Sequence, residues 1–477
     1  MKTIVRKVFL MMILACIWAD LGAKVELPSV IGDNMVLQRN TSVALWGKAR
    51  PSRKVVISPS WTSVKTTVTA DSDGKWSAKV QTPGAGGPFE ITFSDGESLK
   101  IGNILIGEVW LCSGQSNMEM PVAGFGGQPV VGSFEAIMDA NPSVPVRMAT
   151  VARKASNVPL DECKTEWKEH TPEAVASCSA TAYFFGMQLY RTLGVPIGLL
   201  ISNWGGSSIE AWIDQENIEK GYSGELSTAH LGTAELPKNP HQQPACLYNG
   251  MIRPIEPYTV KGIIWYQGES NRGRAEQYVR LSKTYASFMR EKWGNPDMPF
   301  YAVQIAPYNY SDPKATDSPL LQEAQMKASQ EIPHAGLATT LDIGNPTCIH
   351  PEQKKPVGQR LAALALVKDY GFKGISARAP EYKSMSVKDG KVTLQFDLFG
   401  SNLAPIYGPL ASFEVAGADK VFHPAHAVIA SDRKSITVSC EAVPEPVAVR
   451  YAFHNVAEAS LFNNYGIPVG PFRTDSW

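Results

Sequence analysis

The sequence predicts an α/β protein whose parallel sheet is sandwiched between helices and flanked by all-β regions. Between residues 104 and 372, short apolar runs without strict alternation are followed by helical patterns, as in a sheet buried on both faces. Residues 24–103 and 373–477 instead show short alternating runs broken by turn signals, which are typical of β-strands. We therefore expect an N-terminal β domain, a central α/β domain and a C-terminal β region.

The predicted elements follow from these patterns in chain order. The first region is expected to form strands at residues 43–46, 54–58, 64–68 and 89–93. In the central region, strands are expected at residues 104–111, 197–202, 262–266, 300–305 and 336–341, and helices at residues 183–193, 275–293, 320–330 and 355–370. The last region is expected to form strands at residues 392–396, 435–438 and 447–451.

Because ligands of parallel sheets bind beyond the carboxyl ends of the strands, the loops that follow these strands are where a site is expected. The polar, irregular stretch at residues 214–247 is predicted to be a loop inserted over that face.

Residues 1–23 are predicted to be an export signal. Three cations precede an apolar run at residues 8–18, which is too short to span a bilayer as a helix. Cleavage after Ala23 would release a periplasmic or extracellular protein. Alternatively, lipidation of Cys16 would make it a surface lipoprotein. No other stretch is apolar enough to predict a membrane span.

Charge and cysteine usage exclude several classes of function. Lys and Arg number 45, as do Asp and Glu, so no basic excess indicates a nucleic acid partner. The seven cysteines form no CxxC pair and no zinc pattern, and no metal site is predicted. Cys163 and Cys178 have the closest spacing, but the sequence leaves disulfide pairing open, as it does the oligomeric state.

Two of the central strands run into candidate catalytic turns. The first ends in Ser-Gly-Gln-Ser-Asn-Met, which puts Ser116 on a turn at the carboxyl edge of the sheet. A serine nucleophile needs such exposure and a neighbouring base, and N–H groups around the turn can bind an oxyanion. The second strand ends in Trp-Gly-Gly-Ser, where the N–H of Gly206 is a candidate oxyanion donor.

The other candidates follow the third and fifth strands. After the third strand, the side-chain amide of Gln267 or Asn271 could be a further oxyanion donor, the latter less certainly. After the fifth strand, His350 lies just before a helix, and imidazole is the side chain suited to proton transfer at neutral pH.

These four motifs, Gly-Gln-Ser-Asn-Met, Trp-Gly-Gly-Ser, Trp-Tyr-Gln-Gly-Glu-Ser-Asn and Ile-His-Pro, resemble in this order the sialate O-acetylesterase family of SGNH hydrolases. The resemblance covers essentially the whole chain after the export signal. It implies a flavodoxin-like, three-layer α/β/α core and hydrolysis of carbohydrate O-acetyl esters without a cofactor.

The resemblance also implies residue roles. Ser116 would attack the acetyl carbonyl, and His350 would take its proton and return it to the leaving sugar hydroxyl. The N–H groups of Ser116 and Gly206, with the amide of Gln267, would hold the oxyanion, while Glu269 would brace its loop rather than take part in catalysis.

One departure from the family pattern concerns the support of His350. SGNH hydrolases commonly carry an Asp two or three residues before the histidine, where this sequence has Thr347 and Cys348. Asp342 is the nearest upstream carboxylate and a doubtful third member. A backbone carbonyl could instead accept the Nδ1 proton and leave a Ser–His dyad, which we favour slightly. Because loss of an orienting carboxylate can slow catalysis by orders of magnitude, a weakened enzyme or a carbohydrate-binding homologue is an alternative.

The expected substrate is an O-acetylated sialic acid, with acetylated xylan or another plant glycan as the alternative. Trp204 and Tyr266 are candidate sugar contacts, although each is more often a core residue. Arg272 is a candidate partner for a sialate carboxylate, although a structural arginine is the commoner case.

Overall fold

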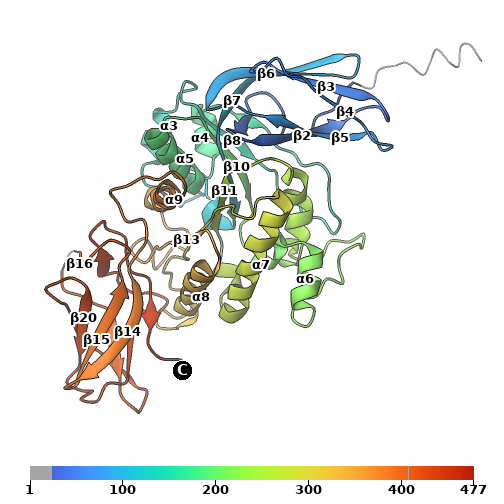
Figure 1. The fold of residues 1–477 in the computed structure, drawn as a ribbon. Helices are drawn as coiled ribbons and strands as arrows, with labels where there is room; N and C mark the ends of the chain where they lie inside the picture. Colours follow the sequence, from blue (N-terminus) through green and yellow to red (C-terminus); the bar gives the residue numbers. More distant parts are fainter. Residues whose placement is uncertain (1–23, 407) are drawn as a thin grey trace, which may run out of the picture.

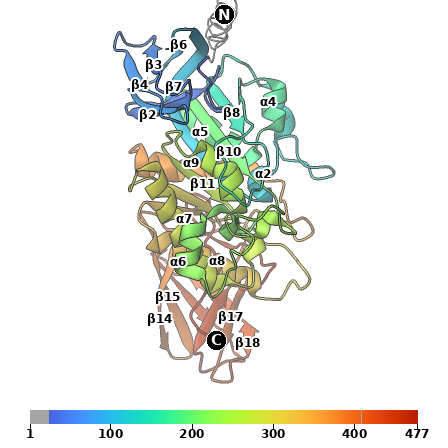
Figure 2. The same cartoon turned by 90° about the vertical axis from the view of Figure 1, so that its right-hand side faces the viewer.

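The computed structural model describes residues 24–406 and 408–477, so the predicted export signal lies outside the described residues (Figure 1). Its largest sheet has eleven strands and includes those of the central region. The smaller sheets lie in the N-terminal and C-terminal regions, whose described residues form strands and no long helix. Figure 2 shows the helical part in the middle, with one β region at each end of the molecule. The predicted mixed α/β fold with additional all-β sheets is confirmed.

The N-terminal region consists of short strands whose inward residues are buried. In β5, for example, every second side chain is buried, so one face packs on the core while the other meets solvent. The sequence analysis missed β1 and β5, and it began β4 two residues too early. The strands are β1 (Val36–Gln38), β2 (Ser42–Lys48), β3 (Lys54–Pro59), β4 (Thr66–Thr69), β5 (Lys75–Gln81) and β6 (Gly86–Ser94).

Strand β7 (Ser98–Gly114) joins the N-terminal region to the central one. Its first half pairs antiparallel with β6, and its second half lies between two parallel strands of the central sheet. The domain boundary predicted at residue 103 therefore falls inside one continuous strand. At roughly 3.3 Å per residue, the N-terminal region contacts the end of β7 that lies tens of ångströms from Ser116.

The central sheet has the order β13-β12-β11-β7-β10-β8, all parallel, with β9 added antiparallel at the edge. The five predicted strands are present, although β13 ends earlier than expected. Strands β8 and β9 were not predicted. The bounds are β8 (Val146–Thr150), β9 (Trp167–Lys168), β10 (Ile197–Asn203), β11 (Gly262–Tyr266), β12 (Phe300–Val303) and β13 (Ala335–Ala338).

Helices cover both faces of this sheet. Along β7, Trp110 and Cys112 pack against α5 and α9, whereas Val109 and Leu111 face the core beneath α7 and α8. Figure 1 shows α5 and α9 on one side of the sheet and α7 on the other. The main helices are α5 (Ala180–Leu193), α6 (Gln215–Tyr222), α7 (Ala275–Trp293), α8 (Asp317–Glu331) and α9 (Lys354–Asp369); α2 (Ser116–Glu119), α3 (Ser133–Met138) and α4 (Pro172–Ser177) are short.

Local signals account for the helix ends. The Ser179 hydroxyl caps α5 by accepting a hydrogen bond from the N–H of Ala182, and Gly194 ends the helix in the left-handed conformation. Asp214 caps α6 in the same way. The stretch predicted as an inserted loop at residues 214–247 therefore begins with a helix, contrary to the prediction.

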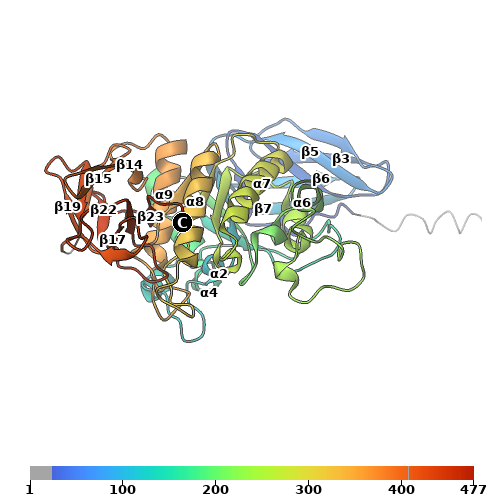
Figure 3. The same ribbon diagram turned by 90° about the horizontal axis from the view of Figure 1, so that it is seen from below.

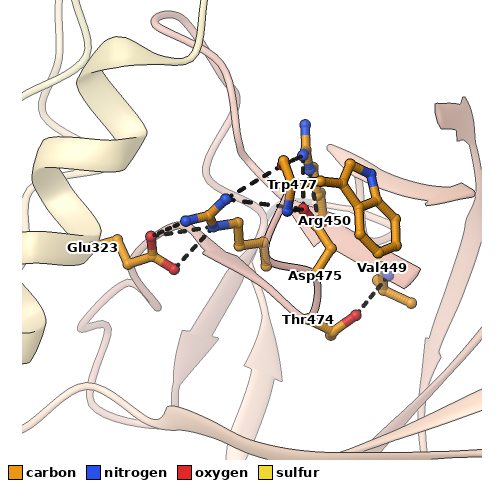
Figure 4. A network of polar contacts seen from close by, with 7 residues as sticks. Glu323, Val449, Arg450, Thr474, Asp475 and Trp477 are labelled. Atoms are coloured by element: carbon orange, nitrogen blue, oxygen red, sulfur yellow. Dashed lines mark hydrogen bonds and ion pairs between the residues drawn. The ribbon is translucent and has the colours of Figure 1, made fainter. Parts of the chain in front are cut away.

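The C-terminal region packs against the central one through α8. Arg473 pairs with Glu323 on α8, and buried Asp475 holds Arg473 and Arg450 together (Figure 4). Figure 3 shows the strands of the C-terminal region beside α8 and α9. They are β14 (Glu381–Lys388), β15 (Lys391–Asp397), β16 (Leu403–Pro405), β17 (Phe413–Ala416), β18 (Phe422–Pro424), β19 (His426–Ile429), β20 (Ser435–Ser439), β21 (Ala448–Tyr451), β22 (Leu461–Asn463) and β23 (Phe472–Arg473).

Three further features concern only the part of the chain that the structure describes. None of its helices has the length and apolar character needed to cross a bilayer. Its six cysteines are free thiols, including Cys163 and Cys178. It contains no cluster of three or more His, Cys, Asp or Glu side chains arranged to hold a metal ion.

Candidate active site

Ser116 lies at the carboxyl end of β7, the strand between β10 and β11. A close approach of backbones puts it there: Gly114 has a φ of 146°, and a Cβ on it would lie 2.1 Å from the carbonyl oxygen of Tyr266. The N–H of Gln115 donates to that same carbonyl at 2.9 Å. Ser116 then begins the short helix α2 and is half-buried. The predicted turn at the sheet edge is therefore present, and its serine is open to one side.

The loop after β10 lies directly against Ser116. A Cβ on Gly205 would lie 3.3 Å from the Cβ of Ser116, and the N–H of Gly205 donates to Glu119 at 2.5 Å. Gly206 follows with a φ of 73°. Within residues 24–406 and 408–477, no protein acceptor is assigned to the N–H of Ser116 or of Gly206. Both N–H groups therefore remain candidates for oxyanion donors.

Asn117 connects the turn of Ser116 to the loop of His350. Its Nδ2 donates to the carbonyl oxygen of Ile349 at 3.1 Å and to Glu269 at 2.7 Å. The residue after the candidate nucleophile is thus bonded to the residue before the candidate base. The structure therefore brings the chain neighbours of Ser116 and His350, which lie 232 positions apart in the sequence, into direct contact.

Gln128 supports the imidazole of His350. The Nδ1 of His350 lies 2.9 Å from Oε1 of Gln128, and the ring of Phe125 packs edge-on at 5.2 Å between centroids. With Nδ1–H as donor, Nε2 keeps its lone pair and is free to act as a base. Burial, and next the positive charge of Lys354, lower the pKa of His350 below its ordinary value of 6.5.

Asp342 does not support His350, contrary to its prediction as a doubtful third member. Both of its carboxylate oxygens accept hydrogen bonds from the guanidinium of Arg360, at 2.7 and 2.6 Å. The predicted alternative, a backbone carbonyl, is also absent from Nδ1, because the side-chain amide of Gln128 takes that position.

The amides of Gln267 and Asn271 brace a loop rather than face Ser116. Nε2 of Gln267 donates to the carbonyl of Ser207 at 3.0 Å and to Oδ1 of Asn271 at 2.7 Å, which uses both of its protons. Nδ2 of Asn271 donates to Glu210 at 2.8 Å. Both side chains are fully buried. Their predicted oxyanion roles are therefore not supported, since both Nε2 protons of Gln267 are engaged and both side chains are fully buried.

Trp204 is the one predicted sugar contact that remains accessible beside Ser116. It is half-buried, and its ring stacks on His241 with an interplanar angle of 7° and 5.8 Å between centroids. The guanidinium of Arg153 lies 5.7 Å from the same ring and pairs with Glu119. Because Glu119 also binds the N–H of Gly205, this aromatic surface is fixed next to the candidate oxyanion donors.

Two other predicted substrate contacts are structural. Tyr266 is completely buried in the core between the sheet and α9. Arg272 packs on the ring of Tyr310, with 3.3 Å from its Cζ to the ring centroid, and pairs with Asp317. Tyr266 therefore cannot stack on a sugar, and the charge of Arg272 is already neutralised.

The sequence analysis missed Gln128, Arg153 and His241 as site residues. Gln128 and Arg153 lie in loops between the central strands, and His241 lies in a short 3-10 helix; none of the three belongs to a motif. A weak signal for Gln128 exists in the glycine-rich run before it, Gly-Phe-Gly-Gly, which is typical of a loop that approaches other backbone closely.

Comparison with known proteins bears on this arrangement. The family described as "Carbohydrate esterase, sialic acid-specific acetylesterase" matches residues 106–366. The sialate O-acetylesterases of Mus musculus and Homo sapiens are 26% and 28% identical, covering 81% and 76% of this chain and 82% and 75% of their own. A crystal structure of a carbohydrate acetylesterase from Xanthomonas citri is 36% identical, with a TM-score of 0.86 over 95% of this chain and all of that one. The chain therefore belongs to the sialic acid-specific acetylesterase family of carbohydrate esterases.

Proposed function

We propose that this protein is a carbohydrate O-acetylesterase that uses Ser116 as nucleophile and His350 as general base. The observation that carries the proposal is the hydrogen bond from Asn117 to the carbonyl of Ile349, because it holds the turn of the serine against the loop of the histidine. Family membership gives independent support.

The proposed reaction has two steps. Ser116 Oγ attacks the acetyl carbonyl carbon while Nε2 of His350 takes its proton, and the N–H groups of Ser116 and Gly206 bind the oxyanion. The intermediate collapses as His350 protonates the departing sugar oxygen, which leaves an acetyl ester on Ser116. Water then attacks that ester with His350 again as base, releasing acetate and the free serine.

We further propose that the core is of the SGNH type. With β8 left aside, the five strands predicted from sequence lie in the order 2-1-3-4-5 of flavodoxin-like sheets, and β8 extends the parallel sheet beyond β10. Ser116 follows the first of them, at the point where the strand order reverses, which is where open α/β sheets bind ligands.

For the substrate we propose an O-acetylated sialic acid, because the curated relatives are named as enzymes acting on it. A specific observation favours a second candidate, a neutral O-acetylated glycan. Arg272, the candidate partner for a sialate carboxylate, is already paired with Asp317, and Arg153 beside Trp204 is paired with Glu119. A site for a neutral sugar needs no unpaired cation.

Acetate release from 9-O-acetyl sialosides and from acetylated xylan, followed by mass spectrometry, separates these substrates. Release by the wild type but not by Ser116→Ala supports the esterase proposal. Exclusive activity on xylan would overturn the sialic acid assignment. No release from either sugar or from p-nitrophenyl acetate would favour a carbohydrate-binding homologue without turnover.

We also propose that the protein is exported, as the predicted signal at residues 1–23 implies, and acts in the periplasm or outside the cell. Fractionation of cells that produce the full chain, with detection of the protein in each fraction, tests this. Retention in the cytoplasm would contradict it.

A further inference from the structure

A buried lysine lies behind the two candidate catalytic residues. Lys354 is the first residue of α9, four positions after His350, and has no exposed surface. Its Nζ donates to Oδ1 of Asn117 at 2.5 Å and lies 5.7 Å from the ring centroid of Tyr266. An ammonium group is rarely buried unless it is paired or has a function, so this position requires an explanation.

The side-chain amide of Asn117 makes three hydrogen bonds, and turning the amide over would break at least one of them. Its oxygen accepts from Lys354, and its Nδ2 protons go to Glu269 and to the carbonyl of Ile349. Lys354 is a donor only, so it fixes which end of the amide faces the His350 loop. Without it, the oxygen of Asn117 would be left buried and unpaired, which weakens the hold of this amide on Ile349.

We propose that Lys354 is a positioning residue for the esterase reaction: through Asn117 it locks the His350 loop against the turn of Ser116, and its charge acts on the imidazole of His350. This inference rests on the proposed function. It assigns no contact between Lys354 and the reacting atoms.

The charged groups around Lys354 come from two elements. Glu269, after β11, and Cys348 and Glu352, in the His350 loop, favour its protonated form. Burial outweighs them and lowers the pKa of Lys354 to about 7. Below that pH the lysine is a cation, which opposes protonation of His350 and so keeps the base in its active form.

Lys354→Met tests the proposal, because methionine fills a similar volume without the charge or the donor. We expect kcat on p-nitrophenyl acetate to fall roughly 10- to 100-fold at pH 8. We also expect the acidic limb of kcat/KM against pH to move to higher pH, since the imidazole loses a neighbouring cation. A merely structural role would not move this limb.

Lys355→Met is the matched control, because it removes the same charge from the adjacent, exposed position. It should leave both kcat and the acidic limb as in the wild type. If Lys354 acts through Asn117, the double variant Lys354→Met/Asn117→Ala should be no slower than the slower single variant. Thermal unfolding of each variant identifies any that fails to fold.

Two results would overturn the proposal: a folded Lys354→Met with an unchanged acidic limb, or effects of the two substitutions that multiply in the double variant. Should Lys354→Met not fold, Asn117→Asp gives the second measurement. It keeps the acceptor for Lys354 and removes the donor to Ile349, so kcat should fall, and an unchanged kcat would overturn the proposal. Activity that survives Ser116→Ala would instead refute the proposed function, so the two failures are distinguishable.

Discussion

Nδ1 of His350 lies 2.9 Å from the side-chain oxygen of Gln128, the position in which serine hydrolases commonly hold a carboxylate. A neutral amide orients the ring and fixes the tautomer, but it stabilises the imidazolium less than an anion does. The proposed base, His350, therefore stays unprotonated to lower pH and has less stabilisation for the positive charge that would develop on it.

Replacing Gln128 tests this support. Gln128→Ala should lower kcat by roughly 10- to 100-fold. This fall is larger than that expected from losing an ordinary hydrogen bond and smaller than that expected from losing a triad carboxylate. Gln128→Glu should raise the pKa of His350, so that the acidic limb of kcat/KM moves to higher pH. Steady-state kinetics on p-nitrophenyl acetate from pH 5 to 9 measures both effects.

Asp342→Asn is the control for the Gln128 variants, because Asp342 binds Arg360 and not His350. Its kcat/KM should equal that of the wild type at every pH. A loss as large as that of Gln128→Ala would return Asp342 to the catalytic group and contradict the assignment of Gln128.

Trp204 should contribute to binding of the sugar rather than to the chemistry. An aromatic stacking surface is worth about 1–2 kcal/mol, so Trp204→Ala should raise KM for an acetylated sugar roughly 5- to 30-fold. The kcat/KM for a small alkyl acetate, which has no ring to stack, should change little. Equal losses on both substrates would mean that Trp204 shapes the catalytic turn instead.

Lys354 should destabilise the folded protein in a defined pH range. Its pKa falls from 10.5 to about 7 on folding, which corresponds to at most about 5 kcal/mol. Between these values the unfolded chain binds the extra proton, so stability rises with pH. Lys354→Met should therefore be more stable than the wild type by roughly 1–3 kcal/mol at pH 6.5, after allowing for the lost bond to Asn117.

Denaturant unfolding of both proteins at pH 6.5 and pH 9.5 checks this window. The advantage of Lys354→Met should shrink at the higher pH, because the wild-type lysine is then neutral in the folded state. A difference that is independent of pH would show that Lys354 is not buried as a cation.

Asp475 should stabilise the docking of the C-terminal region without affecting catalysis. Its carboxylate is fully buried and pairs with Arg450 at 2.8 Å, while Arg473 reaches across to Glu323 (Figure 4). Removing one partner of a buried pair leaves the other unpaired, so Asp475→Ala should cost roughly 2–4 kcal/mol of unfolding free energy. Unfolding and p-nitrophenyl acetate assays on the same sample measure both quantities, and kcat should be unchanged.

Much of the fold could be predicted because long apolar runs leave few alternatives. Strand β11 and helix α7 have the predicted bounds, since each is a continuous pattern with a clear end, such as Gly294 after α7. Strand β8 was missed because Arg147 interrupts its apolar run. The side chain of this arginine is buried by an ion pair with Glu169, which local sequence does not reveal.

In the candidate site, the residues that lie in sequence motifs could be selected in advance, but the residues that hold them in place, such as Gln128, could not. Ser116 and His350 stand in motifs that resemble a known family, and the predicted family is confirmed. Gln128 reaches His350 across 222 positions, so no local pattern pairs them. The amides of Gln267 and Asn271 were assigned donor roles because their type suits an oxyanion, but the fold turns both inward. The type of a residue does not show which way its side chain points in the folded protein.

The most direct test of the central claim is to locate the acetyl group during turnover. Wild-type protein mixed with excess p-nitrophenyl acetate and quenched in acid should carry an acetyl group on the peptide that contains Ser116, as seen by peptide mass spectrometry. Ser116→Ala should carry none and should release no acetate above the uncatalysed rate. Acetate release at the wild-type rate by Ser116→Ala, or an acetyl group found on another residue instead, would contradict the account.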